Sequence, residues 1–418
     1  MTSKATGVLV GAYERDNFGD ILFLEQTRHY LRDVKTIATA PVPADTTPWG
    51  GDVVDSYLTH ASRSDVNFLW TVGGEVGGTS VAQAYEMARQ GDLPQQAAPE
   101  ENELLPGYAS PYLPRPTRFP AFTSSQSIIN SVGLSAAKGL TGLHRVETWQ
   151  ALHEATFISV RDSPSSSFLK RLGIEHEVAP DLVHSMRLTH EVRDELRNVA
   201  LVQAKVKFIH EIGIENFARA LLNANSLKSY HIRFFSAGEA PGHDSTETLE
   251  TLASKVNELS HGTRADVSTA KTAREKFDEI SRCGLWIGTS LHGYIISTSF
   301  GVPRIGLFIE KLNRYASTWQ VPYPTGVKIG DLDRAVEGAL ASGMNRDSMV
   351  LADELAARAD QNARTAVEFA LRGDDPSRDI ELARRRIERM TPTRASLERT
   401  AKSLRDAGAR FYHSVRGS

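Results

Sequence analysis

One stretch of the chain, residues 285–307 with the sequence LWIGTSLHGYIISTSFGVPRIGL, constrains the fold more than any other. It begins with an apolar run, residues 285–287, which predicts a buried strand. After a turn, apolar residues recur at helical spacing until Gly301 and Pro303, which end the predicted helix because proline cannot continue it. A second apolar run, residues 304–307, completes a strand–turn–helix–strand unit that is typical of a parallel α/β sheet.

The turn of this unit contains the first candidate site residues, Thr289, Ser290, His292 and Gly293. Open α/β sheets bind ligands at the carboxyl ends of their strands, and a helix N-terminus favours an anion there. A histidine beside apolar residues is equally compatible with a structural role. The sequence begins like the Gly-x-Ser-x-Gly motif of serine hydrolases but has His292 in place of the last glycine, which argues against that class.

A second candidate region follows the strand predicted at residues 7–12. Residues 17–20 are expected to form a loop before an amphipathic helix. We expect Asn17, Gly19 and Asp20 to approach a ligand, because a glycine lets the backbone come close. Asp20 can instead be the N-cap of the helix, and the sequence leaves both interpretations open.

A third candidate, Arg161, stands at the carboxyl end of the strand predicted at residues 155–160. The Ser-Pro pair at residues 163–164 is expected to supply the N-cap and the first position of the next helix. An arginine at this place suits a phosphate or carboxylate, because its planar fork binds such groups through two hydrogen bonds. The alternative is a structural ion pair with Asp162 or Asp181.

Strand and helix patterns alternate on both sides of residues 186–197, which predicts two doubly wound domains in this chain of 418 residues. From about residue 332 onward the pattern is helical. Residues 73–78, GGEVGG, follow a predicted strand, but they contain neither Gly-x-Gly-x-x-Gly nor a Walker lysine. The sequence therefore gives only a weak indication of a dinucleotide site.

Composition excludes several classes of protein. The net charge of −3 gives no case for a nucleic-acid partner. The one cysteine, Cys283, excludes an intrachain disulfide and is expected as a buried residue on the helix before the central strand. We expect a cytoplasmic protein, because no signal peptide and no apolar run of about 18 residues is present.

The segment 378–418 carries 11 Lys and Arg against 5 Asp and Glu, a net charge of +6. A basic helical tail of this kind is usually a solvated face. It can also lean on the anionic inner surface of a membrane or hold an anionic acceptor.

Three motifs, taken in order, resemble the polysaccharide pyruvyl transferase family. They are GAYERDNFGDILFLE, FISVRDSPSSSFLKRLGI with VAPDLV, and IGTSLHGYIISTSFGVPRIGLFIEKLNRY, and they cover roughly residues 7–325. The resemblance implies an α/β, GT-B-like fold of two Rossmann-like doubly wound domains that face a cleft, with a helical C-terminal extension. We expect an N-terminal acceptor-side domain at 1–190, a C-terminal donor-side domain at 191–340, and the extension at 341–418.

The same resemblance implies an activity and assigns roles. The family transfers pyruvate from phosphoenolpyruvate, as a ketal, onto two sugar hydroxyls of a bacterial surface polysaccharide or its lipid-linked precursor. By position, His292 and Arg161 match catalytic residues, and Lys311 falls where the family often has a lysine. No cofactor and no metal are expected, and the partners are phosphoenolpyruvate and a glycan or lipid-linked oligosaccharide.

One departure from the family pattern concerns the donor phosphate. Many members read Arg-Leu-His-Gly where this chain has Ser290 in the first position. The cation that meets the phosphate must then come from elsewhere. The candidates are Arg161, Lys311, Arg314 and Arg304, of which Arg304 is least favoured because it lies within a predicted strand.

The chemistry suits these residue types. A histidine can deliver a proton to the methylene carbon of the donor and remove one from an attacking hydroxyl. Cations can hold the departing phosphate. Two alternatives stay open at this point: a GT-B glycosyltransferase that uses a nucleotide sugar, and a non-catalytic glycan-binding protein.

Overall fold

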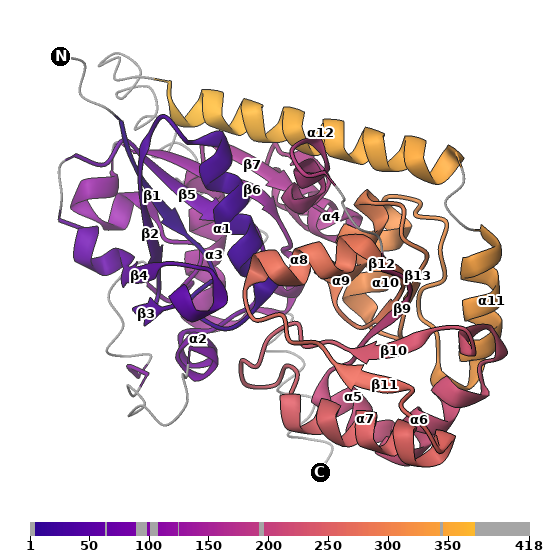
Figure 1. The fold of residues 1–418 in the computed structure, drawn as a ribbon. Helices are drawn as coiled ribbons and strands as arrows, with labels where there is room; N and C mark the ends of the chain where they lie inside the picture. Colours follow the sequence, from indigo (N-terminus) through magenta and orange to yellow (C-terminus); the bar gives the residue numbers. More distant parts are fainter. Residues whose placement is uncertain are drawn as a thin grey trace, which may run out of the picture. The chain divides into compact units, whose positions relative to one another are not determined.

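Two mainly parallel β-sheets organise the structure, as Figure 1 shows. The computed structural model describes residues 5–62, 65–88, 98–100, 108–123, 125–191, 196–342 and 346–372. The chain divides into two units, residues 1–372 and 373–418, and both sheets belong to the first unit. The expectations for the basic segment 378–418 fall outside the described residues, and the three-domain division stays a prediction.

The first sheet collects the apolar runs of the N-terminal half. Its order is β3-β4-β2-β1-β5-β6-β7-β8, with only β3 antiparallel to its neighbour. Strands β1 and β5 are buried along their whole length, as expected where helices cover both faces of a parallel sheet. The bounds are β1 Thr6–Val10, β2 Lys35–Ala40, β3 Ala44–Asp45, β4 Val53–Ser56, β5 Phe68–Val72, β6 Gln126–Val132, β7 Phe157–Val160 and β8 Glu177–Val178.

The second sheet has the order β11-β10-β9-β12-β13 and is parallel throughout. Its register pairs Gly288, at the end of β12, with Gln203, at the end of β9. The ends of these two central strands therefore lie side by side. The bounds are β9 Leu196–Gln203, β10 His231–Phe234, β11 Ala265–Val267, β12 Cys283–Gly288 and β13 Arg304–Gly306.

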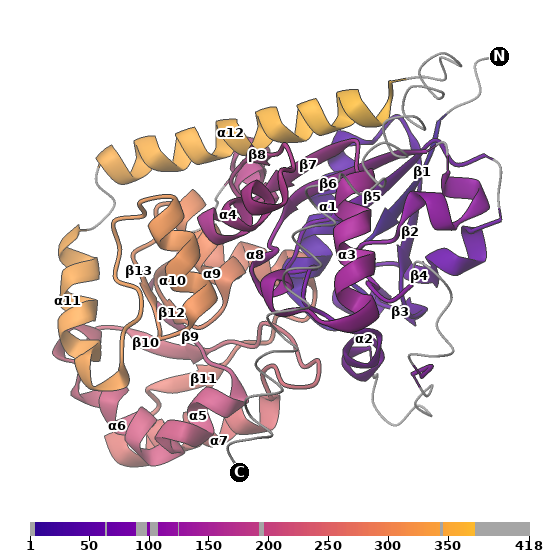
Figure 2. The same cartoon turned by 180° about the vertical axis from the view of Figure 1, so that it is seen from behind.

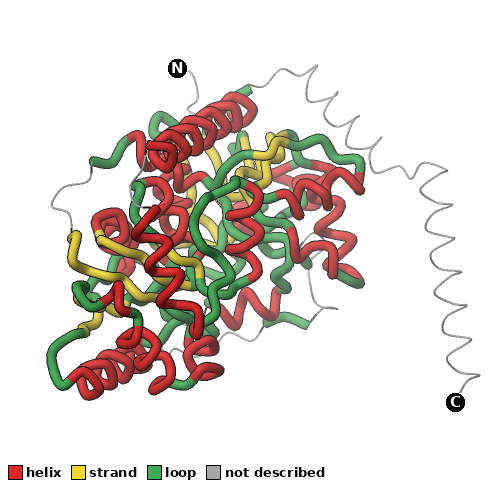
Figure 3. The backbone as a smooth tube through the Cα atoms, turned by 90° about the vertical axis from the view of Figure 1, so that its right-hand side faces the viewer, coloured by secondary structure: helices red, strands yellow, loops and turns green. Residues whose placement is uncertain are grey.

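Helices surround both sheets, and Figure 3 shows the strands lying among them. Those of the first half are α1 Phe18–Tyr30, α2 Val81–Met87, α3 Gly142–Glu154, α4 Ser163–Leu172 and the 3-10 segment η7 Leu182–Leu188. Those of the second half are α5 Val206–Ile212, α6 Ile214–Asn223, α7 Thr246–Ser260, α8 Ala273–Arg282, α9 Leu291–Ser299, α10 Glu310–Thr318 and α11 Leu332–Ser342. The long helix α12 covers Arg346–Ala370.

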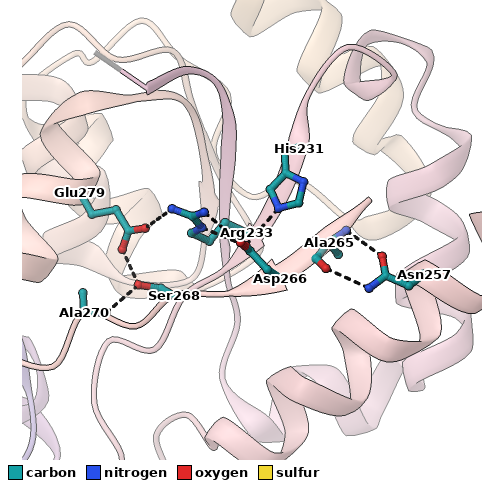
Figure 4. Close-up of polar contacts among 8 residues, drawn as sticks. All are labelled: His231, Arg233, Asn257, Ala265, Asp266, Ser268, Ala270 and Glu279. Atoms are coloured by element: carbon teal, nitrogen blue, oxygen red, sulfur yellow. Dashed lines mark hydrogen bonds and ion pairs between the residues drawn. The ribbon is translucent and has the colours of Figure 1, made fainter. Parts of the chain in front are cut away.

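Polar contacts fix the outer edge of the second sheet, as Figure 4 shows. Arg233 on β10 donates to both carboxylate oxygens of Asp266 on β11 at 2.9 Å. It also donates to Glu279 of α8 at 3.2 Å. Asn257 on α7 bonds both backbone groups of Ala265, at 2.8 and 2.9 Å. The short strand β11 is thereby held between two helices.

Helix α12 contacts both halves of the fold, and Figures 1 and 2 show it running past both sheets. Asn362 on α12 donates to Asn130 on β6 at 2.7 Å and to Ser159 on β7 at 3.2 Å. Asp353 on α12 accepts from Arg187, which also donates to the carbonyl of Ser299 at the end of α9. The helix thus ties the first sheet to the helix that carries His292.

The structure excludes one alternative that the sequence left open and contradicts two local predictions. Helix α1 begins at Phe18 with Asn17 as its N-cap, so Asp20 lies in the first helical turn and is not the cap. Helix α4 is capped by Asp162, which places Ser163 inside the helix. The side chains of aspartate and serine both accept hydrogen bonds from the free N–H groups of a helix N-terminus. The sequence alone could therefore not decide between Asp162 and Ser163 as the cap. Cys283 is buried but opens strand β12 and does not lie on α8.

Candidate active site

The turn between β12 and α9 positions His292, and one buried amide shapes that turn. The side-chain oxygen of Gln203 accepts from the backbone N–H of Thr289 at 2.9 Å and from that of Ser290 at 2.7 Å. The amide nitrogen of Gln203 donates to both oxygens of Asp244, at 2.9 and 3.0 Å. Ser290 is the N-cap of α9, since its hydroxyl accepts from the N–H of Gly293 at 3.3 Å.

His292 lies in the first turn of α9 and is buried against the first helix of the chain. Its ring contacts Phe23 edge-to-face at a centroid distance of 5.0 Å and Phe18 at 6.2 Å. The backbone of Gly19 lies directly against it. Among the described residues its Nε2 has no hydrogen-bond partner, although Asp181 Oδ2 is 3.8 Å away. One ring nitrogen is therefore available for a ligand.

The charges around His292 decide its protonation state. Burial lowers the pKa of His292 well below its usual value, and the positive charges of Arg161 and Lys311 act in the same direction. The imidazole is accordingly neutral at pH 7 in the protein alone. An anion bound among these cations would offset their field and raise the pKa of His292.

Arg161 lies beside this histidine in an ion pair. Its Nη1 donates to Asp181 Oδ2 at 2.8 Å, and both side chains are buried. Burial works to lower the pKa of Arg161, but the carboxylates of Asp181, Glu75 and Asp162 outweigh it and raise that pKa. Asp181 contacts both Arg161 and the edge of His292. The sequence left open a structural pair with Asp162 or Asp181, and the structure shows the pair with Asp181.

A buried relay connects Asp181 to the far end of helix α9. The N–H of Asp181 donates to the Tyr315 hydroxyl at 3.1 Å, and this hydroxyl lies 2.9 Å from His184 Nε2. His184 Nδ1 lies 2.7 Å from the hydroxyl of Ser299, which donates to the carbonyl of Ile295. Burial lowers the pKa of His184 to about 3, with Arg304 acting in the same direction. A neutral His184 protonated on Nδ1 satisfies every bond of the relay.

Helix α10 brings Lys311 to the site and is anchored to the strand end that carries Arg161. Trp319 Nε1 donates to the Arg161 carbonyl at 2.9 Å, and the Thr318 hydroxyl accepts from the N–H of Ser163 at 3.1 Å. Burial lowers the pKa of Lys311 to about 8. Lys205 and Arg161 lower it as well, while Asp20 and Glu75 oppose them.

The loop before α1 is fastened to the second sheet. The N–H of Phe18 donates to the Ala237 carbonyl at 3.0 Å, and Asp16 accepts from the N–H of Glu239 at 2.9 Å. A Cβ at Gly238 would lie 2.1 Å from the Asp16 carbonyl oxygen, so the two loops meet backbone to backbone. Residues from both halves of the fold thereby share one site.

The predicted site residues separate into two groups. The charges of Arg161 and Lys311 act on both His292 and Asp20. Burial raises the pKa of Asp20, while Arg15, Lys311 and Arg161 lower it. Arg161 and Lys311 also lower the pKa of His292. Asn17, Thr289, Ser290 and Gly293 instead make internal contacts: Asn17 and Ser290 are helix caps, Thr289 bonds Gln203, and a Cβ at Gly293 would lie 2.0 Å from the Trp286 ring. Gly19 supports His292.

The remaining cation candidates are engaged elsewhere. Arg314 donates to Glu310 one turn earlier on α10, at 3.1 Å. Arg304 is buried in β13 with its guanidinium 3.9 Å from the Tyr323 ring centroid, as its place in a strand suggested. Sequence reasoning did not select Arg15, Gln203, Lys205 or Tyr315. The sequence does show that Gln203 and Lys205 lie at the end of a predicted strand, which could have marked them as candidates. It does not show that β9 lies beside β12.

Two further observations concern only the described residues. No group of three or more His, Cys, Asp or Glu side chains there could hold a metal ion. None of the helices in that part of the chain is both long and apolar enough to span a bilayer.

Comparisons with known proteins give a family from the sequence and a fold from solved structures. The family model for polysaccharide pyruvyl transferase matches residues 17–307. The UDP-GlcNAc 2-epimerase of Neisseria meningitidis, solved with UDP-GlcNAc, is 12% identical with a TM-score of 0.51, covering 88% of this chain and 100% of that chain. The Methanocaldococcus jannaschii UDP-GlcNAc 2-epimerase, solved with UDP-GlcNAc and UDP, is 11% identical with the same TM-score and coverage. No curated protein sequence matches the chain.

Identities this low show the fold alone. The structural similarity and the two parallel sheets confirm the predicted α/β, GT-B-like class with two Rossmann-like domains. The substrates of the epimerases carry no information about the substrate of this chain.

Proposed function

The chain belongs to the polysaccharide pyruvyl transferase family, and on that premise we propose that it transfers pyruvate from phosphoenolpyruvate onto two sugar hydroxyls as a ketal. The acceptor is a glycan or lipid-linked oligosaccharide of bacterial surface polysaccharide biosynthesis. One observation carries the proposal: His292 is buried, its Nε2 has no partner among the described residues, and its pKa is lowered by burial and by the positive charges of Arg161 and Lys311.

The donor would change the protonation of His292. Phosphoenolpyruvate brings a phosphate and a carboxylate, and these negative charges would offset the field of Arg161 and Lys311. The pKa of His292 then rises, so the histidine gains a proton as the donor binds. The enzyme would thus hold a general acid only when there is a donor to protonate.

The reaction balances with one histidine as the proton carrier. His292 delivers its proton to the methylene carbon of the donor, and the first sugar hydroxyl adds to the cationic centre and loses its proton to the imidazole. The C–O bond to phosphate then breaks, with the phosphate held by Lys311 and Arg161. The second hydroxyl attacks the same carbon, and its proton passes to the departing phosphate, which gives the cyclic ketal and hydrogen phosphate. The activity needs no cofactor in this scheme.

The test measures phosphate release from phosphoenolpyruvate across a panel of acceptor glycans, with mass spectrometry of the glycan product. We expect phosphate release that depends on acceptor and a product that carries the ketal. His292→Asn should lower turnover by roughly 10² to 10⁴, the range for losing a general acid–base group.

Two other outcomes would contradict the proposal. Nucleotide-sugar hydrolysis without phosphoenolpyruvate turnover would identify a glycosyltransferase. Glycan binding without release of phosphate from any donor would identify a non-catalytic binding protein.

A further inference from the structure

Lys205 lies at the same sheet edge as the helix that carries His292. Strand β9 ends at Gln203 and strand β12 at Gly288, and these two residues are register partners in parallel strands. Lys205 and Ser290 each follow their strand by two residues. The backbone N–H of Lys205 donates to the hydroxyl of Thr289 at 3.3 Å, so the two turns are joined directly.

Lys205 and Lys311 come from separate elements, but their charges act on each other. Lys205 is the first charged group to lower the pKa of Lys311 beyond the effect of burial. Lys205, Arg15 and Lys311 all act on His243, whose pKa burial and these cations lower to about 3. Both lysines are partly buried. Positive charge is thus concentrated at this edge of the second sheet, and Lys311 acts on both His243 and His292.

These two lysines differ from the arginines around them in having no ion-pair partner in the described part of the chain. Arg161 is paired with Asp181 at 2.8 Å, and Arg15 has Asp20 at 3.6 Å. The nearby carboxylate of Asp244 is already used by Gln203 and by the N–H of Ala237. Two unpaired like charges in a partly buried place repel each other, and a bound anion removes that cost.

We propose that Lys205 is a donor-binding residue, which with Lys311 holds the anionic end of the donor and supplies the charge that Ser290 lacks. This inference rests on the proposed function for the identity of the donor. The two lysines approach from opposite elements, the end of β9 and helix α10. Because the two lysines would neutralise the charge of the donor, Arg161 could contact the donor without breaking its ion pair with Asp181.

The test compares Lys205→Met with Lys228→Met in the full-length protein. Lys228 is an exposed lysine of the same half of the fold, and its removal changes the net charge equally. We expect Lys205→Met to raise the KM for phosphoenolpyruvate roughly 10- to 100-fold, as for a lost charge-assisted hydrogen bond, with the acceptor KM unchanged. Lys228→Met should leave both constants within twofold. Should Lys205→Met fail to fold, Lys205→Gln gives the same comparison.

A second-site rescue separates donor binding from a structural role. Because Ser290 lies beside Lys205 at the sheet edge, an arginine there can reach the same anion. The double variant Lys205→Met with Ser290→Arg should recover at least tenfold of the lost donor affinity. A lysine that only stabilises the loop would not be replaced in this way. An unchanged donor KM in Lys205→Met, or a raised donor KM that Ser290→Arg does not lower, overturns the inference.

Calorimetry with phosphoenolpyruvate and with inorganic phosphate keeps the two proposals apart. If the wild-type protein turns over phosphoenolpyruvate and Lys205→Met binds it equally well, only the inference fails. If the wild type binds phosphate but not phosphoenolpyruvate, and Lys205→Met loses the phosphate, the anion site stands and the proposed donor fails. If the wild type binds neither, both fail.

Discussion

Gly19 of helix α1 and His292 of helix α9 are in contact so close that only a glycine fits: a Cβ built on Gly19 would lie 1.8 Å from Nδ1 of the imidazole. The contact joins the first helix of one half of the fold to the candidate catalytic helix of the other. Gly19 therefore sets the position of the histidine ring, and the ring of Phe23 packs edge-to-face against it.

Gly19→Ala should consequently impair catalysis more than folding. The residue is in the first turn of α1 and has no positive φ, so alanine is compatible with its backbone. The added methyl group must displace His292, and we expect turnover to fall at least tenfold while far-UV circular dichroism stays unchanged. Steady-state kinetics on the purified variant measure the effect.

The matched control for this variant is Gly338→Ala. Gly338 also lies within a helix, α11, but a Cβ there would meet nothing within 4 Å. It should gain roughly 0.5–1 kcal/mol in stability with full activity, because alanine is the better helix former. Equal activity in Gly19→Ala and Gly338→Ala would show that the ring position is not critical.

The titration of Lys311 predicts how donor use depends on pH. Its pKa is about 8 in the protein without ligand, so the ammonium is charged below this value and neutral above it. If the charge holds the donor, kcat/KM for phosphoenolpyruvate should fall as pH rises through about 8, by up to tenfold for each further pH unit. Lys311→Arg should remove this decline, because a guanidinium stays charged.

An alkaline decline that persists unchanged in Lys311→Arg would assign the titration to another group. Lys205 is the candidate, since burial also lowers its pKa. The profile of Lys205→Arg would then distinguish the two lysines.

Local sequence patterns located the turn that carries His292 and the strand end that carries Arg161, but not the groups that surround them. The turn at His292 and the strand end at Arg161 follow from apolar runs and helix signals within a few residues. Strand order is not a local property, however. Gln203 shapes the turn at residues 289–290 because β9 lies beside β12, which no pattern in either strand indicates.

Contacts between distant segments were beyond sequence reasoning for the same physical reason. Tyr315 bonds the N–H of Asp181 across 134 positions of sequence, and Asn362 reaches Asn130 across 232. The hydroxyl and backbone groups predicted to meet the donor were assigned from their place in a turn. In the structure these groups form hydrogen bonds within the protein, as buried polar groups generally do.

Arg161→Lys tests whether the buried pair with Asp181 is the whole role of this arginine. A lysine can keep one charged contact to Asp181 but lacks the second arm of the fork. We expect the donor KM to rise about tenfold in Arg161→Lys, with the thermal midpoint close to that of the wild type. Differential scanning calorimetry and donor kinetics on the same preparation measure both.

Arg161→Met gives the contrasting case. It leaves the Asp181 carboxylate buried without its cation, which should cost about 3–5 kcal/mol of stability. If Arg161→Lys keeps both the stability and the donor KM of the wild type, Arg161 has a structural role alone.

Ser290→Ala should be mild, because the structure gives this residue a role in capping. Its hydroxyl accepts from the N–H of Gly293, and losing an N-cap of this type costs about 1 kcal/mol. Its own N–H donates to Gln203 through the backbone and is kept in alanine. Urea denaturation should show the loss of stability, and turnover should stay within a few-fold of the wild type.

Gln203→Leu is the informative comparison for Ser290→Ala. It removes the acceptor shared by the N–H groups of Thr289 and Ser290 and the donor to Asp244, so it should destabilise the protein by more than Ser290→Ala does. A ranking in which Ser290→Ala loses turnover severely at unchanged stability would contradict the capping role. The hydroxyl of Ser290 would then have to act on the substrate itself, because its remaining contacts are retained by the backbone.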